Sequence, residues 1–138
     1  YFQKIFTKTK YLSANFFEWS FLNKKEINQY PFLEVINDLK EFTSKNNSTV
    51  LIRNIPKKNK LINLIGSPKE VWSIATPEIK LNTRYHGAGD LTTALFAHYI
   101  TQKISEKRIL EGLTNDIFQI ISKKRKTNKF KSTNLSNL

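Results

Sequence analysis

The chain has 138 residues, 39% of them hydrophobic, which suits one modest domain with a single core and argues against overall disorder. It contains no cysteine, so a disulfide framework and a thiolate metal site are excluded, and no stretch approaches the roughly 18 apolar residues of a membrane span. A net charge of +12 raises the question of nucleic acid or another anionic partner.

The first expected elements are a buried strand and a short helix. The apolar run 11–14 ends at Asn15, whose side chain is a good helix N-cap. The aromatic-rich stretch 16–22 follows, with Glu18 as its only acid. We expect the aromatic side chains of this stretch to pack in the core under a sheet rather than to form a stacking platform.

A second helix and three strands are expected next. Pro31 opens the helix, whose apolar stripe includes positions 32, 33, 35, 36, 39 and 42, and which ends in the polar turn 45–48. Residues 49–52 are typical of a strand covered on both faces, after which Pro56 and the basic stretch 57–60 turn the chain. Residues 61–65 and 71–75 flank a turn at 66–69 and predict an antiparallel pair that Pro77 ends.

The last third of the chain predicts an extended segment and two helices. Residues 79–84 lead into a glycine-rich turn, a helix runs from Asp90 to about residue 100, and a second amphipathic helix covers 109–121 after a break at 104–105. The predicted order is β-α-α-β-β-β-α-α, an α/β sheet open at its N-terminal side.

Residues 122–138 are predicted to be a basic, flexible tail. Six basic residues and no acid lie in it: Lys123, Lys124, Arg125, Lys126, Lys129 and Lys131. The other basic residues are scattered among asparagines and isoleucines rather than grouped in a patch. The charge therefore does not favour nucleic-acid binding, and we expect no nucleic-acid or membrane partner.

The glycine-rich turn 85–90 is the stretch most suggestive of chemistry. Gly87 and Gly89 allow tight backbone turns, and the helix that follows presents unpaired N–H groups and a positive dipole end, which together suit a phosphate. Asp90 in such a site can be a helix cap. It can also accept a proton from an attacking hydroxyl while the amides hold the charge on the phosphoryl group. The motif alone leaves both readings open.

Two motifs together carry a resemblance to a known family. Asn-Phe-Phe-Glu at 15–18 follows a buried strand, and Gly-Ala-Gly-Asp at 87–90 follows a hairpin and opens a helix. In this arrangement the chain resembles, from about residue 9 to 121, the C-terminal half of ribokinase-like kinases, and most of all the pyridoxal kinases. Stretch 14–22 corresponds to the family's Pro-Asn-x-x-Glu-x-Glu-x-Leu segment, and 50–52 and 70–74 look like two of its strands.

The resemblance implies a fold and a reaction. Residues 1–121 would form the C-terminal half of a ribokinase-like three-layer α/β sandwich, with a β-hairpin before the glycine-rich turn and two C-terminal helices. The reaction would be ATP-dependent phosphorylation of the hydroxymethyl group of pyridoxal, pyridoxine or pyridoxamine, giving pyridoxal 5′-phosphate in vitamin B6 salvage. The full-length form would be a soluble, cytoplasmic homodimer.

The resemblance also assigns roles to individual residues. Asp90 matches the general base, and Gly87, Ala88 and Gly89 match the anion hole around the γ-phosphate. Glu18 matches the residue that orders Mg²⁺ through water, a role that suits a hard cation with retained waters. The residues matched to nucleotide binding are Asn15, Asn54 and Tyr85.

The chain also departs from the family pattern. Arg53-Asn54 stands where many relatives have Thr-Ser or a similar pair, and Ser20 replaces the second glutamate of the Asn-x-x-Glu segment. The N-terminal half, which in this family supplies most vitamin contacts and the active-site flap, has no counterpart here.

The absence of methionine also bears on whether the chain is whole. A chain that starts at Tyr1 and has no methionine is expected to be a fragment or processed piece. Two hypotheses follow. The chain is the C-terminal part of a small-molecule kinase and inactive alone, or it is a non-catalytic remnant or basic binding protein on a kinase-derived scaffold.

Overall fold

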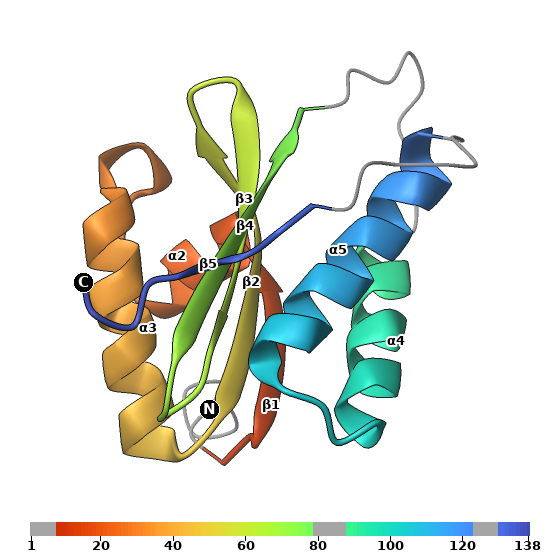
Figure 1. Cartoon of the computed structure of the whole chain (residues 1–138). Helices are drawn as coiled ribbons and strands as arrows, with labels where there is room; N and C mark the ends of the chain where they lie inside the picture. Colours follow the sequence, from red (N-terminus) through yellow and green to blue (C-terminus); the bar gives the residue numbers. More distant parts are fainter. Residues whose placement is uncertain (1–7, 79–87, 123–129) are drawn as a thin grey trace.

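The computed structural model describes residues 8–78, 88–122 and 130–138. A central sheet separates two helical layers, with α2 and α3 on one face and α4 and α5 on the other (Figure 1). The elements in chain order are β1 (Tyr11–Asn15), α2 (Phe16–Leu22), the 3₁₀ turn η1 (Ile27–Gln29), α3 (Phe32–Asn46), β2 (Thr49–Lys57), β3 (Lys60–Gly66), β4 (Val71–Pro77), α4 (Ala88–Thr101), α5 (Glu106–Ser122) and β5 (Thr133–Asn134).

The five strands lie in the order β1-β2-β3-β4-β5. Strands β1 and β2 are parallel, and their pairing ends where Asn15, the last residue of β1, lies opposite Arg53. The remaining pairs are antiparallel, and the expected hairpin of β3 and β4 is present, with Ile65 opposite Trp72. The α/β class, the hairpin before the glycine-rich turn and the two helices after it are therefore confirmed.

Strand β2 contributes side chains to the hydrophobic cores on both faces of the sheet. Val50 and Ile52 belong to the core under α2 and α3, and Leu51 belongs to the core under α4 and α5. This alternation follows from the two-residue period of a strand. All three side chains are fully buried, as expected for a strand covered on both faces. The same alternation assigns Arg53 to the face of α4 and α5.

The expectation that all aromatic residues of 16–22 lie in the core was partly wrong. Phe16 and Trp19 are buried, but Phe17 and Phe21 are 65% and 77% exposed. The helical period explains the division, because positions 16, 19 and 20 face the sheet while 17 and 21 point away. Leu33, expected in the stripe of α3, is also exposed.

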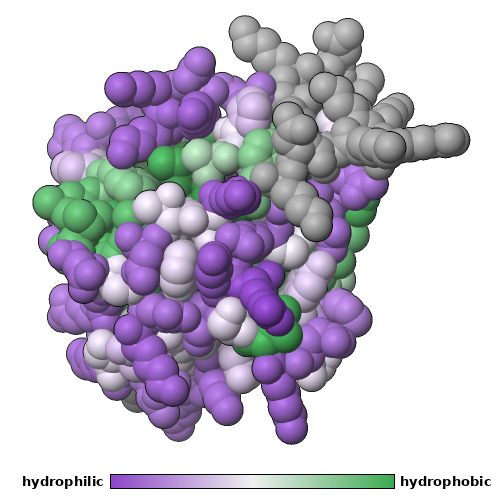
Figure 2. Space-filling model, in the orientation of Figure 1, coloured by the Kyte–Doolittle hydropathy of each residue, from purple (hydrophilic) through white to green (hydrophobic). Residues whose placement is uncertain are grey.

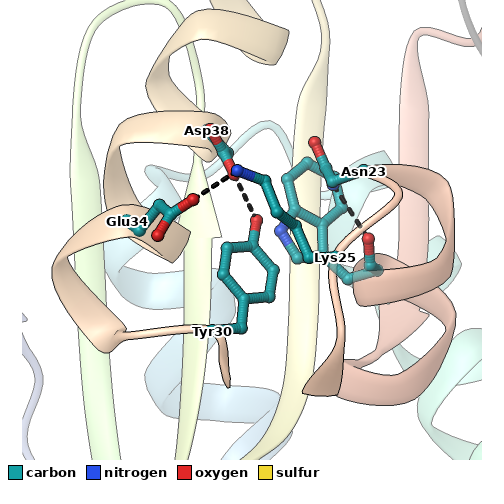
Figure 3. Close-up of polar contacts among 6 residues, drawn as sticks. Asn23, Lys25, Tyr30, Glu34 and Asp38 are labelled. Carbon is teal, nitrogen blue, oxygen red and sulfur yellow. Dashed lines mark hydrogen bonds and ion pairs between the residues drawn. The ribbon is translucent and has the colours of Figure 1, made fainter. Parts of the chain in front are cut away.

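A polar cluster joins α2, η1 and α3 (Figure 3). Lys25 forms an ion pair with Glu34, and the Tyr30 hydroxyl donates to Asp38 Oδ2 at 2.6 Å. Burial of Tyr30, followed by this hydrogen bond, raises the pKa of its hydroxyl far above the ordinary value. The Asn23 side chain donates to a carbonyl of α2, so the connection between the two helices is held at several points.

Strand β2 is longer than expected. Pro56 lies inside it, opposite Leu61, and the chain turns only after Lys57, at Lys58 with its positive φ of 57°. The register shifts between Ile52 and Ile55, and Asn54 in that interval has a φ of 61°. A bulge of this kind allows a strand to bend and to continue through a proline.

The described part of the expected tail, residues 130–138, is not loose. Strand β5 pairs with β4, and the ring of Phe130 packs edge to face on Phe118 at 4.7 Å. The Ser132 hydroxyl donates to Glu111 at 2.7 Å, and Lys40 Nζ donates to the Leu138 carbonyl at 2.6 Å. Residues 130–138 dock because β4 offers an edge whose backbone groups can pair with a polar segment that has no periodicity of its own, while residues 123–129 of the expected tail lie outside the described residues.

The surface agrees with the composition. Figure 2 shows a largely hydrophilic face with a hydrophobic area at the left, on the side of α3. None of the described helices is both long enough and apolar enough to cross a membrane.

Candidate active site

Three segments meet at the carboxyl ends of the parallel strands. Strand β1 ends at Asn15, β2 passes it at Arg53, and the start of α4 carries Gly89 and Asp90. In an open α/β sheet this edge is where ligands commonly bind, because loops and helix starts converge there. The topology thus brings distant parts of the sequence into one region.

Asn15 and Glu18 form a capping box at the start of α2. The Asn15 backbone N–H donates to Glu18 Oε2, and the Glu18 backbone N–H donates to Asn15 Oδ1, both at 2.8 Å. The expectation of Asn15 as N-cap is confirmed. Each side chain thereby satisfies an otherwise unpaired N–H of the helix start.

The capping box bears on the expected Mg²⁺ role. Glu18 is exposed, and in residues 8–78, 88–122 and 130–138 no hydrogen bond is donated to its Oε1. One carboxylate oxygen is thus available to a metal-bound water. In those same ranges no three His, Asp or Glu side chains gather into a metal site. The residues fit a cation that keeps most of its waters rather than a caged one.

Helix α4 begins at Ala88 and places Asp90 in its first turn, where an exposed carboxylate interacts favourably with the helix dipole. The Thr93 hydroxyl donates to the Gly89 carbonyl at 3.0 Å. Within the described ranges no hydrogen bond is donated to the Asp90 carboxylate. Two residues matched by the resemblance, Tyr85 and Gly87, lie outside the described residues.

Arg53 is a site residue to which the sequence assigned no role. Its side chain is only 9% exposed and lies under the start of α4, so that a Cβ added to Gly89 would be 3.4 Å from its Nη1. Burial lowers the pKa of the guanidinium, whereas the charges of Glu18 and Asp90 raise it. A signal was present, because strand alternation places position 53 on the buried side that Leu51 also faces.

Asn54 is held in place through a hydrogen bond from its backbone N–H. Its N–H donates to Asn63 Oδ1 at 3.0 Å, and Asn63 in turn donates to the Thr114 hydroxyl of α5 at 3.3 Å. The Asn54 residue is exposed at the bulge of β2. Its assignment to nucleotide binding stays a prediction.

The groups gathered at the end of β1 and the start of α4 indicate which ligand this region can bind. A helix start and a buried guanidinium attract an anion, and two exposed carboxylates, Glu18 and Asp90, lie close enough to affect the pKa of that guanidinium. This combination suits the binding of a phosphate with a cation beside it. Asp90 adds, at the same helix start, a carboxylate of the kind that can accept a proton.

The fold belongs to a recognisable class. No known protein-family profile matches the chain, and no curated protein matches it in sequence. Solved structures do match it, and they define the chain as the C-terminal portion of a pyridoxal-kinase-like fold. The chain spans about half the length of the structures it matches.

Three of these structures illustrate the likeness. Pyridoxal kinase from Entamoeba histolytica matches with a TM-score of 0.79 and 17% identity, over 96% of this chain and 53% of that chain. Pyridoxal kinase from Staphylococcus aureus in complex with AMP-PCP matches with a TM-score of 0.74 and 16% identity, over 95% and 54%. A putative phosphomethylpyrimidine kinase from Bacteroides thetaiotaomicron matches with a TM-score of 0.71 and 20% identity, over 92% and 45%.

Proposed function

We propose that this chain is the nucleotide- and phosphate-handling part of an ATP-dependent kinase that phosphorylates the hydroxymethyl group of pyridoxal or a related vitamer. The observation that carries the proposal is the meeting of Asp90, Arg53 and the Asn15–Glu18 pair at the start of α4. The likeness to pyridoxal kinases adds support, since one of them has been solved with AMP-PCP and pyridoxal together.

In this proposal each group has a defined task. The backbone amides at 87–89 hold the phosphoryl group, and Asp90 takes the proton of the attacking alcohol. The Glu18 carboxylate would hold Mg²⁺ through a water, and the bound ion would supply charge neutralisation on the phosphates. Asn15, Asn54 and Tyr85 contact the nucleotide. Phosphoryl transfer depends mainly on positioning and charge stabilisation, which this arrangement can provide.

The substrate pocket requires residues beyond this chain. The matched pyridoxal kinases are about twice as long, so the vitamin contacts and the homodimer are attributed to a form that includes a second half of the fold. We therefore expect the 138-residue chain alone to bind ATP weakly and to produce no pyridoxal 5′-phosphate.

A second candidate is a non-catalytic protein on the same scaffold. The mutual hydrogen bonds of Asn15 and Glu18 favour it, because capping alone accounts for both side chains without a metal. The two candidates differ in whether Asp90 matters to turnover.

The experiment is a pyridoxal kinase assay with Mg-ATP on the chain co-expressed with the N-terminal half of the E. histolytica enzyme. Turnover should appear, and Asp90→Asn should reduce kcat by about 10²- to 10⁴-fold while nucleotide affinity hardly changes. Glu41→Gln, an exposed carboxylate on α3, is the matched control and should keep full activity. An Asp90→Asn variant that retains more than about a tenth of the turnover contradicts the role of a general base.

A further inference from the structure

Arg53 is a buried cation that forms no ion pair within the described residues. It is 9% exposed, its Nε is buried, and this atom has no hydrogen-bond partner. In the part of the chain that the structure describes, the one ion pair within 4.0 Å joins Lys25 and Glu34, so no described carboxylate pairs directly with Arg53. A buried Nε–H in this state is unfavourable, because it has lost water and has gained no hydrogen-bond acceptor among the described residues.

The nearby carboxylates do not offset this cost. Glu18 and Asp90 both act to raise the pKa of the guanidinium, yet burial outweighs them and the pKa is lowered. Both carboxylates are exposed, so water screens their attraction for Arg53. A purely structural cation would instead be expected to pair closely with them.

The start of α4 lies directly over this guanidinium. A Cβ on Gly89 would be 3.4 Å from Nη1 and 3.8 Å from Nη2, so the absence of a side chain leaves the guanidinium open to the helix start. Helix α4 has 14 residues, and its positive dipole end attracts the same kind of ligand as Arg53 does. Two independent features therefore converge on one anion.

We propose that Arg53 and the N-terminus of α4 together bind the terminal phosphate of a nucleoside di- or triphosphate. The guanidinium donates to phosphate oxygens, which supply the acceptor that its Nε lacks among the described residues. This proposal deepens the proposed function and depends on it for the nucleotide. The alternative is that Arg53 serves only to offset the charges of Glu18 and Asp90.

The experiment measures binding of ADP, AMP and inorganic phosphate to the 138-residue chain by calorimetry, together with the Tm. Arg53→Met should weaken ADP binding by about 10- to 100-fold and leave the weaker AMP binding nearly unchanged. Arg53→Lys should fall between, since it keeps the charge and loses the planar fork. Gly89→Ala keeps its amide and places a methyl against Nη1, so it should also weaken ADP binding. Arg108→Gln, an exposed arginine on α5, is the matched control.

The Tm without ligand distinguishes a phosphate-binding Arg53 from an Arg53 that serves only to offset the charges of Glu18 and Asp90. Arg53→Met should keep or raise it, because an unpaired buried charge is removed, whereas a structural cation would give a lower Tm. Inorganic phosphate that binds as tightly as ADP would identify a free-phosphate site and overturn the nucleotide assignment.

Two further outcomes are distinguishable. If wild type binds ADP and both Arg53→Met and Gly89→Ala bind it equally well, the role of Arg53 is wrong and the proposed kinase function stands. If wild type binds neither ADP nor phosphate, both proposals fail.

Discussion

Glu18 combines two roles that one substitution can separate. Its carboxylate caps α2, and in the proposed function it orients a metal-bound water. Glu18→Gln keeps the capping hydrogen bond, because glutamine serves equally well in a capping box, but it removes the charge. We expect an unchanged Tm and a higher Mg²⁺ concentration for half-maximal activity in the co-expressed kinase assay. An unchanged Mg²⁺ titration curve would limit Glu18 to the helix cap.

Tyr99 provides a pH-dependent contact between α4 and α5. Its hydroxyl donates to Asp116 Oδ2 at 2.5 Å, and this hydrogen bond, with burial second, raises the pKa of Tyr99 from 10.0 to about 12. Because the folded state holds the proton more tightly, the stabilisation is complete below pH 10 and is lost as the pH rises towards 12.

Urea unfolding of Tyr99→Phe at several pH values tests this contact. The wild type should lose more unfolding free energy between pH 10 and 12 than the variant does, because only the wild type has this proton to lose. Parallel curves for the two proteins would show that the contact does not contribute.

At the scale of elements, α4 and α5 pack closely because one position between them is a glycine. A Cβ at Gly112 would lie 2.8 Å from the Tyr99 ring, closer than packed atoms allow. The start of α5 is further fixed by Ser105. Its carbonyl accepts from the N–H of Ile109, and its hydroxyl accepts from the N–H of Arg108. The position of Asp90 at the start of α4 therefore depends on packing along the whole helix pair.

The C-terminal segment is expected to stabilise the sheet. Phe130→Ala removes the contact with Phe118 and part of the core under α5, and should cost about 2 kcal/mol, less than a fully buried phenylalanine because this ring is half-buried. Removal of residues 130–138 should cost more and promote aggregation, since it leaves β4 as an open edge. Thermal unfolding that is unaffected by either change would support the original expectation of a loose tail.

At the scale of the molecule, β1 is one edge of the described sheet. Among the described residues β1 pairs only with β2, and a groove of about 410 Å³ runs beside it along α2. Phe17 and Phe21 line this groove with Leu12 and Ala14, and both aromatic rings are largely exposed. An open strand edge next to an apolar groove favours association with another chain.

Self-association of the isolated chain should therefore depend on this groove. Sedimentation of the wild type should show association that grows with concentration, and Phe17→Ser with Phe21→Ser should reduce it. Leu33→Ser, an exposed apolar residue on α3 that does not line the groove, is the control and should associate like the wild type. A monomeric wild type at high concentration would contradict this expectation.

The sequence by itself determined the local features whose cause lies within a few residues. Asn15 as a helix cap, Pro31 at the start of α3, the hairpin of β3 and β4 and the doubly covered β2 all follow from side-chain chemistry or from the period of apolar residues. The pairing of two short motifs also identified the fold, which solved structures of pyridoxal kinases confirm.

Only the tertiary structure decided what depends on distant neighbours. The docking of 130–138 on β4 requires an edge that another part of the chain leaves open, and the exposure of Phe17 and Phe21 depends on how α2 is turned against the sheet. Arg53 is the clearest case, because strand alternation indicates only that this one of 23 basic residues faces the buried side, not what covers it. Its importance comes from burial beneath a helix that begins 35 positions later, and no local pattern encodes that contact.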